Sequence, residues 1–218
     1  LGVFNAKAIA DALSQLSEKE SADIIVLDSS NNSKYLAPLL AVNLNAGMAS
    51  GVTEVPVSLN PFVVKRVAFS SKAFVHTEIK SGKKIICLAK NSFGIKEENT
   101  SPAKEEFTAA LSEADFKITL SAVEKTSGKI TIADADVVVS GGRGLKGPEN
   151  WGMLESLAEV LGAATACSKP VSDLHWRPHS EHVGQTGKPV AANLYIAIGI
   201  SGAIQHLAGV NASKCKVV

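Results

Sequence analysis

The stretch Ala-Asp-Val-Val-Val-Ser-Gly-Gly-Arg-Gly-Leu-Lys-Gly (135–147) decides the fold of the second half of this chain. Its β-branched run over 135–140 predicts a buried strand, and the glycine-rich segment 141–147 predicts a loop at the carboxyl end of that strand. Asn150 is a candidate N-cap for a helix whose apolar residues recur at helical spacing, and Gly162 is its candidate C-terminal stop. A strand, a glycine loop and a helix in this order are typical of a parallel α/β sheet.

The sequence beyond this helix continues the alternation of strands and polar segments. It predicts a short buried strand over 164–167, a long polar loop over 168–189, a buried strand over 194–200, a short helix from Ser201 through Leu207 and a strand over 214–218. The last of these strands has neither a partner nor a following turn in the sequence. Ligands of open α/β sheets bind outside the carboxyl ends of the strands, where helix N-termini offer free N–H groups to phosphates, so the glycines that follow two of these strands indicate a ligand site.

The first half of the sequence predicts a second α/β layer followed by a β-rich stretch. We expect a helix capped by Asn5, a strand over 22–28 that is covered on both faces, a helix over 35–44, β-rich segments over 55–67 and 73–79, a hairpin turn at 80–83 before a strand over 85–89, a solvated loop over 96–106 and a strand over 116–123. The turn-forming segment 125–128 predicts a linker. The sequence therefore predicts an α/β fold with two domains, 1–126 and 127–218, each a mainly parallel sheet flanked by helices.

Bulk composition excludes several classes of protein. The chain has 218 residues, of which 45% are hydrophobic and 20% charged, as expected for a protein with a packed core. Its 22 basic and 21 acidic residues leave a net charge of +1, so no strong field attracts nucleic acid or an anionic membrane surface. The longest apolar runs are far shorter than a membrane span. Three widely spaced cysteines, Cys87, Cys167 and Cys215, are interpreted as buried thiols in a reducing compartment.

The ends of the sequence are abrupt. The first residues lead directly into a helix without an initiator Met or a signal peptide, and the last residues are a strand at its beginning. We therefore expect the first domain to be incomplete at its start and the second at its end.

Each candidate motif has an ordinary structural alternative. Gly-Gly-Arg-Gly (141–144) is neither the dinucleotide fingerprint nor a P-loop, and a glycine-rich turn with a surface Arg143 explains it equally well. Val-Gly-Gln-Thr-Gly (183–187) offers a hydroxyl, a carboxamide and a flexible backbone, or it is simply a polar turn. His206 lies in the first turns of the predicted helix that follows a strand, where it is either a ligand contact or a core histidine.

Two other kinds of site are not expected. The spacing of His175, His179 and His182 is irregular and no Cys or carboxylate pattern completes a metal site. No serine of the candidate loops has a histidine and an acidic group at a spacing suggestive of nucleophilic catalysis.

Three motifs together carry a family resemblance. Val-Val-Val-Ser-Gly-Gly-Arg-Gly-Leu-Lys (137–146), Val-Gly-Gln-Thr-Gly-Lys (183–188) and Leu-Tyr-Ile-Ala-Ile-Gly-Ile-Ser-Gly-Ala-Ile-Gln-His-Leu-Ala-Gly (194–209) closely resemble the C-terminal domain of the electron transfer flavoprotein α subunit. Residues 1–124 resemble the N-terminal domain of that family more loosely.

The resemblance implies a Rossmann-like FAD-binding domain in an electron carrier that is not itself an enzyme. Such a subunit works as a heterodimer with a β subunit, accepts electrons from acyl-CoA and other primary dehydrogenases, as in fatty acid oxidation, and passes them to a quinone oxidoreductase or a similar acceptor. It implies a protein that is not embedded in a membrane and does not bind nucleic acid. The implied location is the cytoplasm in bacteria or the mitochondrial matrix in eukaryotes.

The resemblance also assigns site residues. It places Arg143 near the flavin or its phosphates, Ser168 and Lys169 beside the flavin ring, Val183 to Thr186 against the isoalloxazine, and Ser201 to His206 at the pyrophosphate and ring. Lys169 stands where the family usually has Arg, which replaces a planar stacking group by a point charge. The cofactor-binding residues that the sequence predicts are therefore Arg143, Ser168, Lys169, Val183, Gly184, Gln185, Thr186, Ser201, Gly202, Ala203, Ile204, Gln205 and His206.

Two other classes of function remain as alternatives. A flavin-dependent oxidoreductase acting directly on a small substrate would need an acid, a base or a nucleophile, and none accompanies the flavin motifs. A purely structural or nucleotide-sensing module would leave the glycine loops and His206 unexplained.

Overall fold

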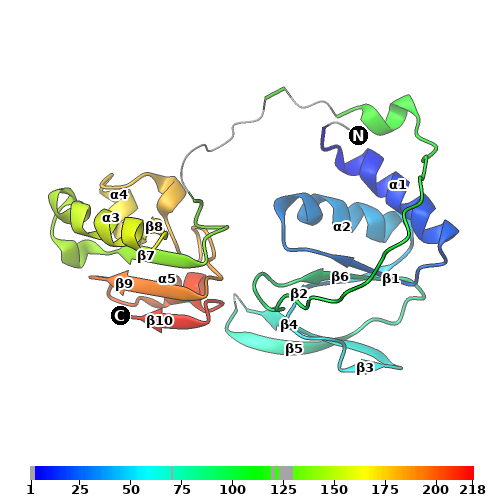
Figure 1. Ribbon diagram of the computed structural model, residues 1–218. Helices are drawn as coiled ribbons and strands as arrows, with labels where there is room; N and C mark the ends of the chain where they lie inside the picture. Colours follow the sequence, from blue (N-terminus) through cyan, green and yellow to red (C-terminus); the bar gives the residue numbers. More distant parts are fainter. Residues whose placement is uncertain (1–2, 70, 119–120, 123–129) are drawn as a thin grey trace. The chain divides into compact units, whose positions relative to one another are not determined.

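The computed structural model describes residues 3–69, 71–118, 121–122 and 130–218. The chain forms two compact units (Figure 1), and each is described by itself. The predicted domain boundary between residues 126 and 127 and the predicted linker at 125–128 lie outside the described residues.

The first unit contains a mixed sheet rather than a mainly parallel one. Its elements are α1 (Ala6–Lys19), β1 (Ile24–Leu27), α2 (Asn31–Asn43), β2 (Gly47–Val52), β3 (Ser58–Leu59), β4 (Phe62–Ala68), β5 (Ala73–Glu78), β6 (Lys84–Leu88) and the 3₁₀ turn η1 (Glu113–Phe116). The strand order is β1-β6-β2-β4-β3, and β5 pairs with β4. Strands β1, β6 and β2 are parallel, whereas β4 is antiparallel to both β2 and β3. The prediction of a mainly parallel sheet is wrong here, because the short connections around β4 permit only antiparallel pairing.

Two local predictions for this unit need correction. Strand β1 was expected to be covered on both faces, but Ile24 and Val26 are 43% and 55% exposed. It is an edge strand, and α1 and α2 cover only the face that carries Ile25 and Leu27. The segment 80–83 is not a hairpin turn, because β6 lies between β1 and β2 and pairs with both.

The start of α1 confirms the predicted cap. The Asn5 side chain accepts a hydrogen bond from the backbone N–H of Ala8 at 3.1 Å, which satisfies one of the free donors of the first turn. Asn150 is different, because its side chain donates to the Leu145 carbonyl at 2.8 Å and makes no cap hydrogen bond.

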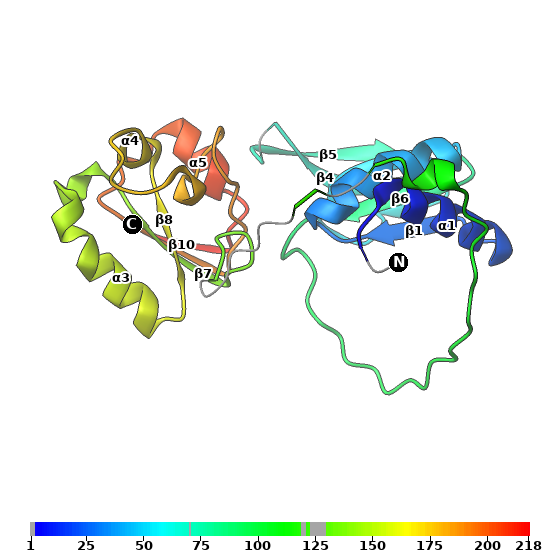
Figure 2. The same ribbon diagram turned by 90° about the horizontal axis from the view of Figure 1, so that it is seen from above.

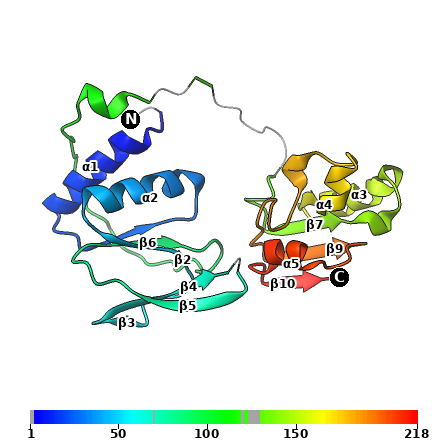
Figure 3. The same ribbon diagram turned by 180° about the vertical axis from the view of Figure 1, so that it is seen from behind.

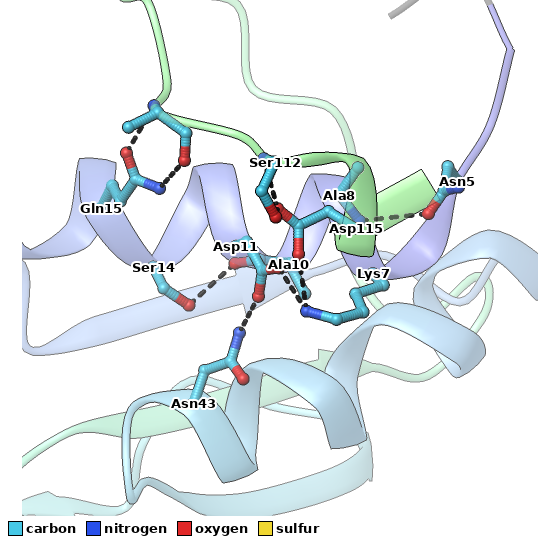
Figure 4. A network of polar contacts seen from close by, with 11 residues as sticks. Asn5, Lys7, Ala8, Ala10, Asp11, Ser14, Gln15, Asn43, Ser112 and Asp115 are labelled. Carbon is cyan, nitrogen blue, oxygen red and sulfur yellow. Dashed lines mark hydrogen bonds and ion pairs between the residues drawn. The ribbon is translucent and has the colours of Figure 1, made fainter. Parts of the chain in front are cut away.

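A strap formed by residues 105–116 runs back along α1 (Figure 4). The Gln15 amide exchanges two hydrogen bonds of 2.9 Å with the backbone of Ala110, and Lys7 forms an ion pair of 2.9 Å with Asp115. The strap ends in η1, so the strand predicted from Phe116 is absent from the described residues there. The preceding segment 93–104 is exposed, contains no helix or strand as predicted, and forms a long loop (Figure 2).

The second unit has the predicted parallel sheet. Its elements are β7 (Val137–Gly141), the 3₁₀ turns η2 (Arg143–Leu145) and η3 (Pro148–Asn150), α3 (Trp151–Val160), β8 (Ala164–Cys167), α4 (Lys169–Asp173), the 3₁₀ turn η4 (His179–Glu181), β9 (Leu194–Ile198), α5 (Ile204–Val210) and β10 (Cys215–Val217). The strand order is β10-β9-β7-β8, and all three pairings are parallel. The final strand therefore has a partner, β9, which the sequence did not reveal.

Two apolar clusters cover the two faces of this sheet. Figures 1 and 3 show the strands and helices of the unit from opposite sides. Helices α3 and α4 pack on the face of Val139 and Ile196, whereas the segment 183–192 and α5 pack on the face of Val138 and Tyr195. The chain steps from β7 outward to β8 and then returns to the other side of β7 to form β9. This reversal places the loops after β7 and β9 side by side.

The expected burial of the three cysteines is confirmed for Cys167 and is wrong for Cys87 and Cys215. All are free, Cys167 is buried, Cys87 is half-buried and Cys215 is exposed. Burial is the main cause that raises the pKa of Cys167 to about 12, so this thiol is a protonated core group. Cys215 is accessible because β10 carries it on an exposed strand.

A candidate cofactor cavity in the second unit

The loops after β7 and β9 touch backbone to backbone. The N–H of Gly142 donates to the Ile198 carbonyl at 2.8 Å, and that of Gly144 donates to the Gly199 carbonyl at 2.9 Å. A Cβ atom on Gly142 would lie only 2.0 Å from the Gly199 carbonyl oxygen. The glycines of the motif are therefore required by close packing between the two loops, at the point where the strand order reverses.

A cavity of about 920 Å³ opens at this reversal. Its volume lies in the range of roughly 300–1,000 Å³ that is usual for sites of small molecules and cofactors. The lining comes from four segments that follow strands β7, β8 and β9 or lie between them. Its residues are Arg143, Gly144, Ser168, Lys169, Pro170, Asp173, His182, Val183, Gly184, Gln185, Thr186, Gly199, Ile200, Ser201, Ala203, Gln205 and His206.

Most of the residues that the sequence predicts to bind the cofactor line this cavity. Gly202 and Ile204 are the two predicted residues that do not line it, and Ile204 is 59% exposed at the start of α5. Sequence reasoning missed Asp173 and His182, which also line the cavity. The sequence around Asp173 does not predict a helix there, because α4 is only 5 residues long and too short to show a helical period. For His182, the spacing to the neighbouring histidines bears only on a metal site.

Backbone hydrogen bonds hold the lining segments in place. The Ser168 N–H donates to the Gly141 carbonyl at 3.0 Å, which ties the start of α4 to the end of β7. The Gln185 N–H donates to the Gln205 carbonyl at 2.7 Å, which ties the 183–187 loop to α5. The cavity wall is thus fixed largely by main-chain contacts, which suits a preformed site.

His206 is a buried, neutral imidazole. Its Nε2 lies 2.9 Å from the hydroxyl of Tyr195, which is itself buried. Burial lowers the pKa of His206, the charge of His182 lowers it further, and the backbone of Val183 acts in the opposite direction. Burial also raises the pKa of Tyr195 well above its usual range, so the phenol keeps its proton beside the ring.

His182 is more deeply buried, at 2% exposure. Burial is the main cause that lowers its pKa, and the nearby charges of His179 and Lys169 add to the effect, whereas Asp173 opposes it. The His179 ring lies 5.2 Å away, centroid to centroid. Within the described ranges, no group of three or more His, Cys, Asp or Glu side chains is arranged to hold a metal ion.

These two histidines predict an acid-sensitive second unit. In the unfolded chain both take up protons as the pH falls through about 6.5, whereas their folded pKa values lie lower. The unfolded state then binds more protons, so the free energy of unfolding should fall below pH 6.5 by up to ~1.4 kcal/mol per pH unit for each histidine. Urea unfolding followed by tryptophan fluorescence measures it, since both tryptophans, Trp151 and Trp176, lie in this unit.

A double variant, His182→Gln with His206→Gln, should flatten that acid limb. His76→Gln is the matched control, because His76 is exposed on β5 of the other unit. A parent-like acid limb in the double variant would contradict the assignment.

Comparison with known proteins places this architecture in a family. Residues 1–115 match the family described as electron transfer flavoprotein domain, and residues 131–211 match the electron transfer flavoprotein FAD-binding domain. The second match contains every residue that lines the cavity.

Individual relatives agree. The chain is 34% identical over 215 residues to the electron transfer flavoprotein subunit alpha of Bacillus subtilis, covering 98% of this chain and 66% of that protein. It is 38% identical over 190 residues to the subunit alpha of Syntrophomonas wolfei, covering 84% of this chain and 58% of that protein. It is also 38% identical over 190 residues to the probable mitochondrial subunit alpha of Caenorhabditis elegans, covering 87% and 56%.

The chain thus spans between 56% and 66% of the length of these relatives. In the part of the chain that the structure describes, no helix combines the length and apolar character needed to cross a bilayer. With both halves matched and the cavity inside the FAD-binding match, the chain belongs to the electron transfer flavoprotein family, as an α subunit.

Proposed function

We propose that this chain is the FAD-binding part of an electron carrier that works as a heterodimer with a β subunit. It accepts electrons from acyl-CoA and other primary dehydrogenases and passes them to a quinone oxidoreductase or a similar acceptor. The observation that carries the proposal is the cavity at the strand reversal, whose lining lies within the FAD-binding match. The strands of this unit are parallel, and their order reverses between β7 and β9. This supports the interpretation of 127–218 as a Rossmann-like domain, separate from a domain 1–126.

The chemistry of the lining fits an anionic dinucleotide. Arg143 and Lys169 bring two positive charges to the cavity, where phosphate oxygens are the natural partners of such groups. Gln185, Thr186 and Ser201 add amide and hydroxyl groups that suit the polar edges of a flavin or the hydroxyls of its side chain. His206, with its Nε2 bonded to Tyr195, tunes the potential from the cavity wall.

The bound FAD supplies the redox chemistry, and the protein sets the energy of the electrons. The positive charges of Arg143 and Lys169 in the cavity wall would stabilise the negative charge of a reduced flavin held there. Lys169 keeps the charge of the Arg that the family usually has at this position but gives up the planar stack over an aromatic ring. For a protein of this family we propose the bacterial cytoplasm or the mitochondrial matrix as the location.

The complete gene product, co-expressed with its β subunit, should purify yellow with bound FAD. Adding a primary dehydrogenase with its substrate should bleach the flavin absorption, whereas the small substrate alone should not. A flavin-free heterodimer at saturating FAD would contradict the proposal. Bleaching by the small substrate alone would favour a flavin-dependent oxidoreductase instead.

A further inference from the structure

The ring of His182 lies in the cavity wall and is unpartnered within the part of the chain that the structure describes. Among the described residues, neither ring nitrogen of His182 makes a hydrogen bond. Nδ1 is inaccessible to solvent, whereas Nε2 is not shut off from it. Buried polar groups are nearly always paired, and leaving one unpaired costs about 1–3 kcal/mol. Nδ1 carries this cost in the folded chain. Nε2 has no hydrogen bond within the described residues either and is not shut off from solvent, so it is the nitrogen that can take a partner from outside the fold.

The backbone around His182 holds the ring in one place. Its N–H donates to the His179 carbonyl at 3.1 Å, and its carbonyl accepts from the Lys188 N–H at 2.8 Å. The next residue, Val183, donates to the Cys167 carbonyl at 2.9 Å. A Cβ on Gly187 would lie 2.4 Å from the His182 carbonyl oxygen, so this part of the chain has no room to shift.

The ring is directed at the cavity. His182 is one of its lining residues, and its Nε2 would lie 3.4 Å from a Cβ atom built on Gly184, another lining residue. Its titratable neighbours across the same space are Lys169 and Asp173 on α4 and His206 on α5, with His179 beside it. No described residue offers Nδ1 an acceptor for a proton. This favours the tautomer with the proton on Nε2, which is then a hydrogen-bond donor.

We propose that His182 contacts the cofactor directly, its Nε2–H donating a hydrogen bond to an acceptor of the flavin nucleotide bound in the cavity. This inference rests on the proposed function. It adds a residue that lies just before the Val-Gly-Gln-Thr motif and outside the predicted set. The acceptor is a phosphate, hydroxyl or ring carbonyl oxygen of the nucleotide, all of which accept from an imidazole N–H.

The test compares two substitutions in the whole heterodimer. His182→Leu should weaken FAD binding about tenfold, because the cofactor loses one hydrogen bond in a buried site. The flavin-free protein should stay as stable as the parent or become more stable, since a buried nitrogen without a hydrogen bond, Nδ1, is removed. His182→Gln keeps a donor of similar length and should recover most of the affinity. His76→Leu, an exposed histidine of the other unit, should change neither quantity.

Each outcome decides the question. FAD titration by calorimetry and urea unfolding of the flavin-free form give the two readouts. Parent-like affinity in His182→Leu overturns the contact, and so does a loss of affinity that merely parallels a loss of flavin-free stability. If the parent itself takes up no FAD, the proposed function falls and this inference falls with it, whereas a failure confined to His182→Leu leaves the proposed function intact.

Discussion

Replacing Gly142 with Ala is expected to lower the free energy of unfolding of the second unit by about 3 kcal/mol or more and to abolish FAD binding. The new Cβ would lie 2.0 Å from the Gly199 carbonyl oxygen and 2.5 Å from its carbon. Both of these are backbone atoms, which cannot rotate away. Relief requires β7 and β9 to separate at their carboxyl ends, which breaks the bond from the Gly142 N–H to the Ile198 carbonyl. Overpacking costs about 1–3 kcal/mol or more, and a lost hydrogen bond adds about 1 kcal/mol.

A glycine of the same unit provides the matched control. Gly152 is the second residue of α3, and a Cβ there would meet nothing within 4 Å. Gly152→Ala should therefore not destabilise the unit and should stabilise it by up to about 0.5–1 kcal/mol, the gain found in a helix interior. Tryptophan fluorescence in urea measures both variants, and flavin absorption after purification reports FAD content. A Gly142→Ala protein with parent-like stability and FAD content would show that the two loops are not locked together as described.

Replacing His206 with Ala is expected to lower the first one-electron potential of the bound FAD by about 65–130 mV. Reduction makes the flavin anionic, and a hydrogen bond to a charged group contributes about 1.5–3 kcal/mol. Since a tenfold change, about 1.4 kcal/mol, corresponds to 59 mV for one electron, the loss is well within reach of a spectroscopic titration. The expectation follows from the proposed place of His206 beside the flavin.

The control for this experiment is Tyr195→Phe. It removes the partner that lies 2.9 Å from His206 Nε2 but leaves the imidazole in the cavity wall. Both variants should lose stability, because each leaves a buried polar group unpaired. Only His206→Ala should shift the potential strongly. An unchanged potential in His206→Ala, or equal shifts in both variants, would return His206 to the role of a core histidine.

The cavity was largely predictable because its residues lie in short runs of distinctive sequence. Gly-Gly-Arg-Gly (141–144) follows a β-branched strand, and a parallel sheet brings the loops after its strands to one edge. His182 and Asp173 could not be found in this way, because their place depends on where the chain returns to the sheet after β8. The local sequence around these two residues does not predict where the chain returns to the sheet.

The first unit was less predictable for a related reason. Strand β2 carries Gly47 and Gly51 and few β-branched residues, so it gives almost no strand signal. Its place between β6 and β4 makes the sheet mixed, and it leaves β1 at the edge. An apolar run such as Ile24 to Leu27 predicts a strand, but only the strand order decides how many of its faces are covered.

The strap along α1 has a consequence for proteolysis. Its contacts with α1 are mostly polar and exposed, and pairs of this kind contribute about 0–1 kcal/mol each. The strap stays bound to α1 because both belong to one continuous chain, which holds the strap at an effective concentration on the order of millimolar. The exposed loop 93–104 carries Lys96 and Lys104 and supplies that continuity. One tryptic cut there would turn the contact between α1 and the strap from a tethered contact into an association between two separate pieces of chain, which depends on their concentration.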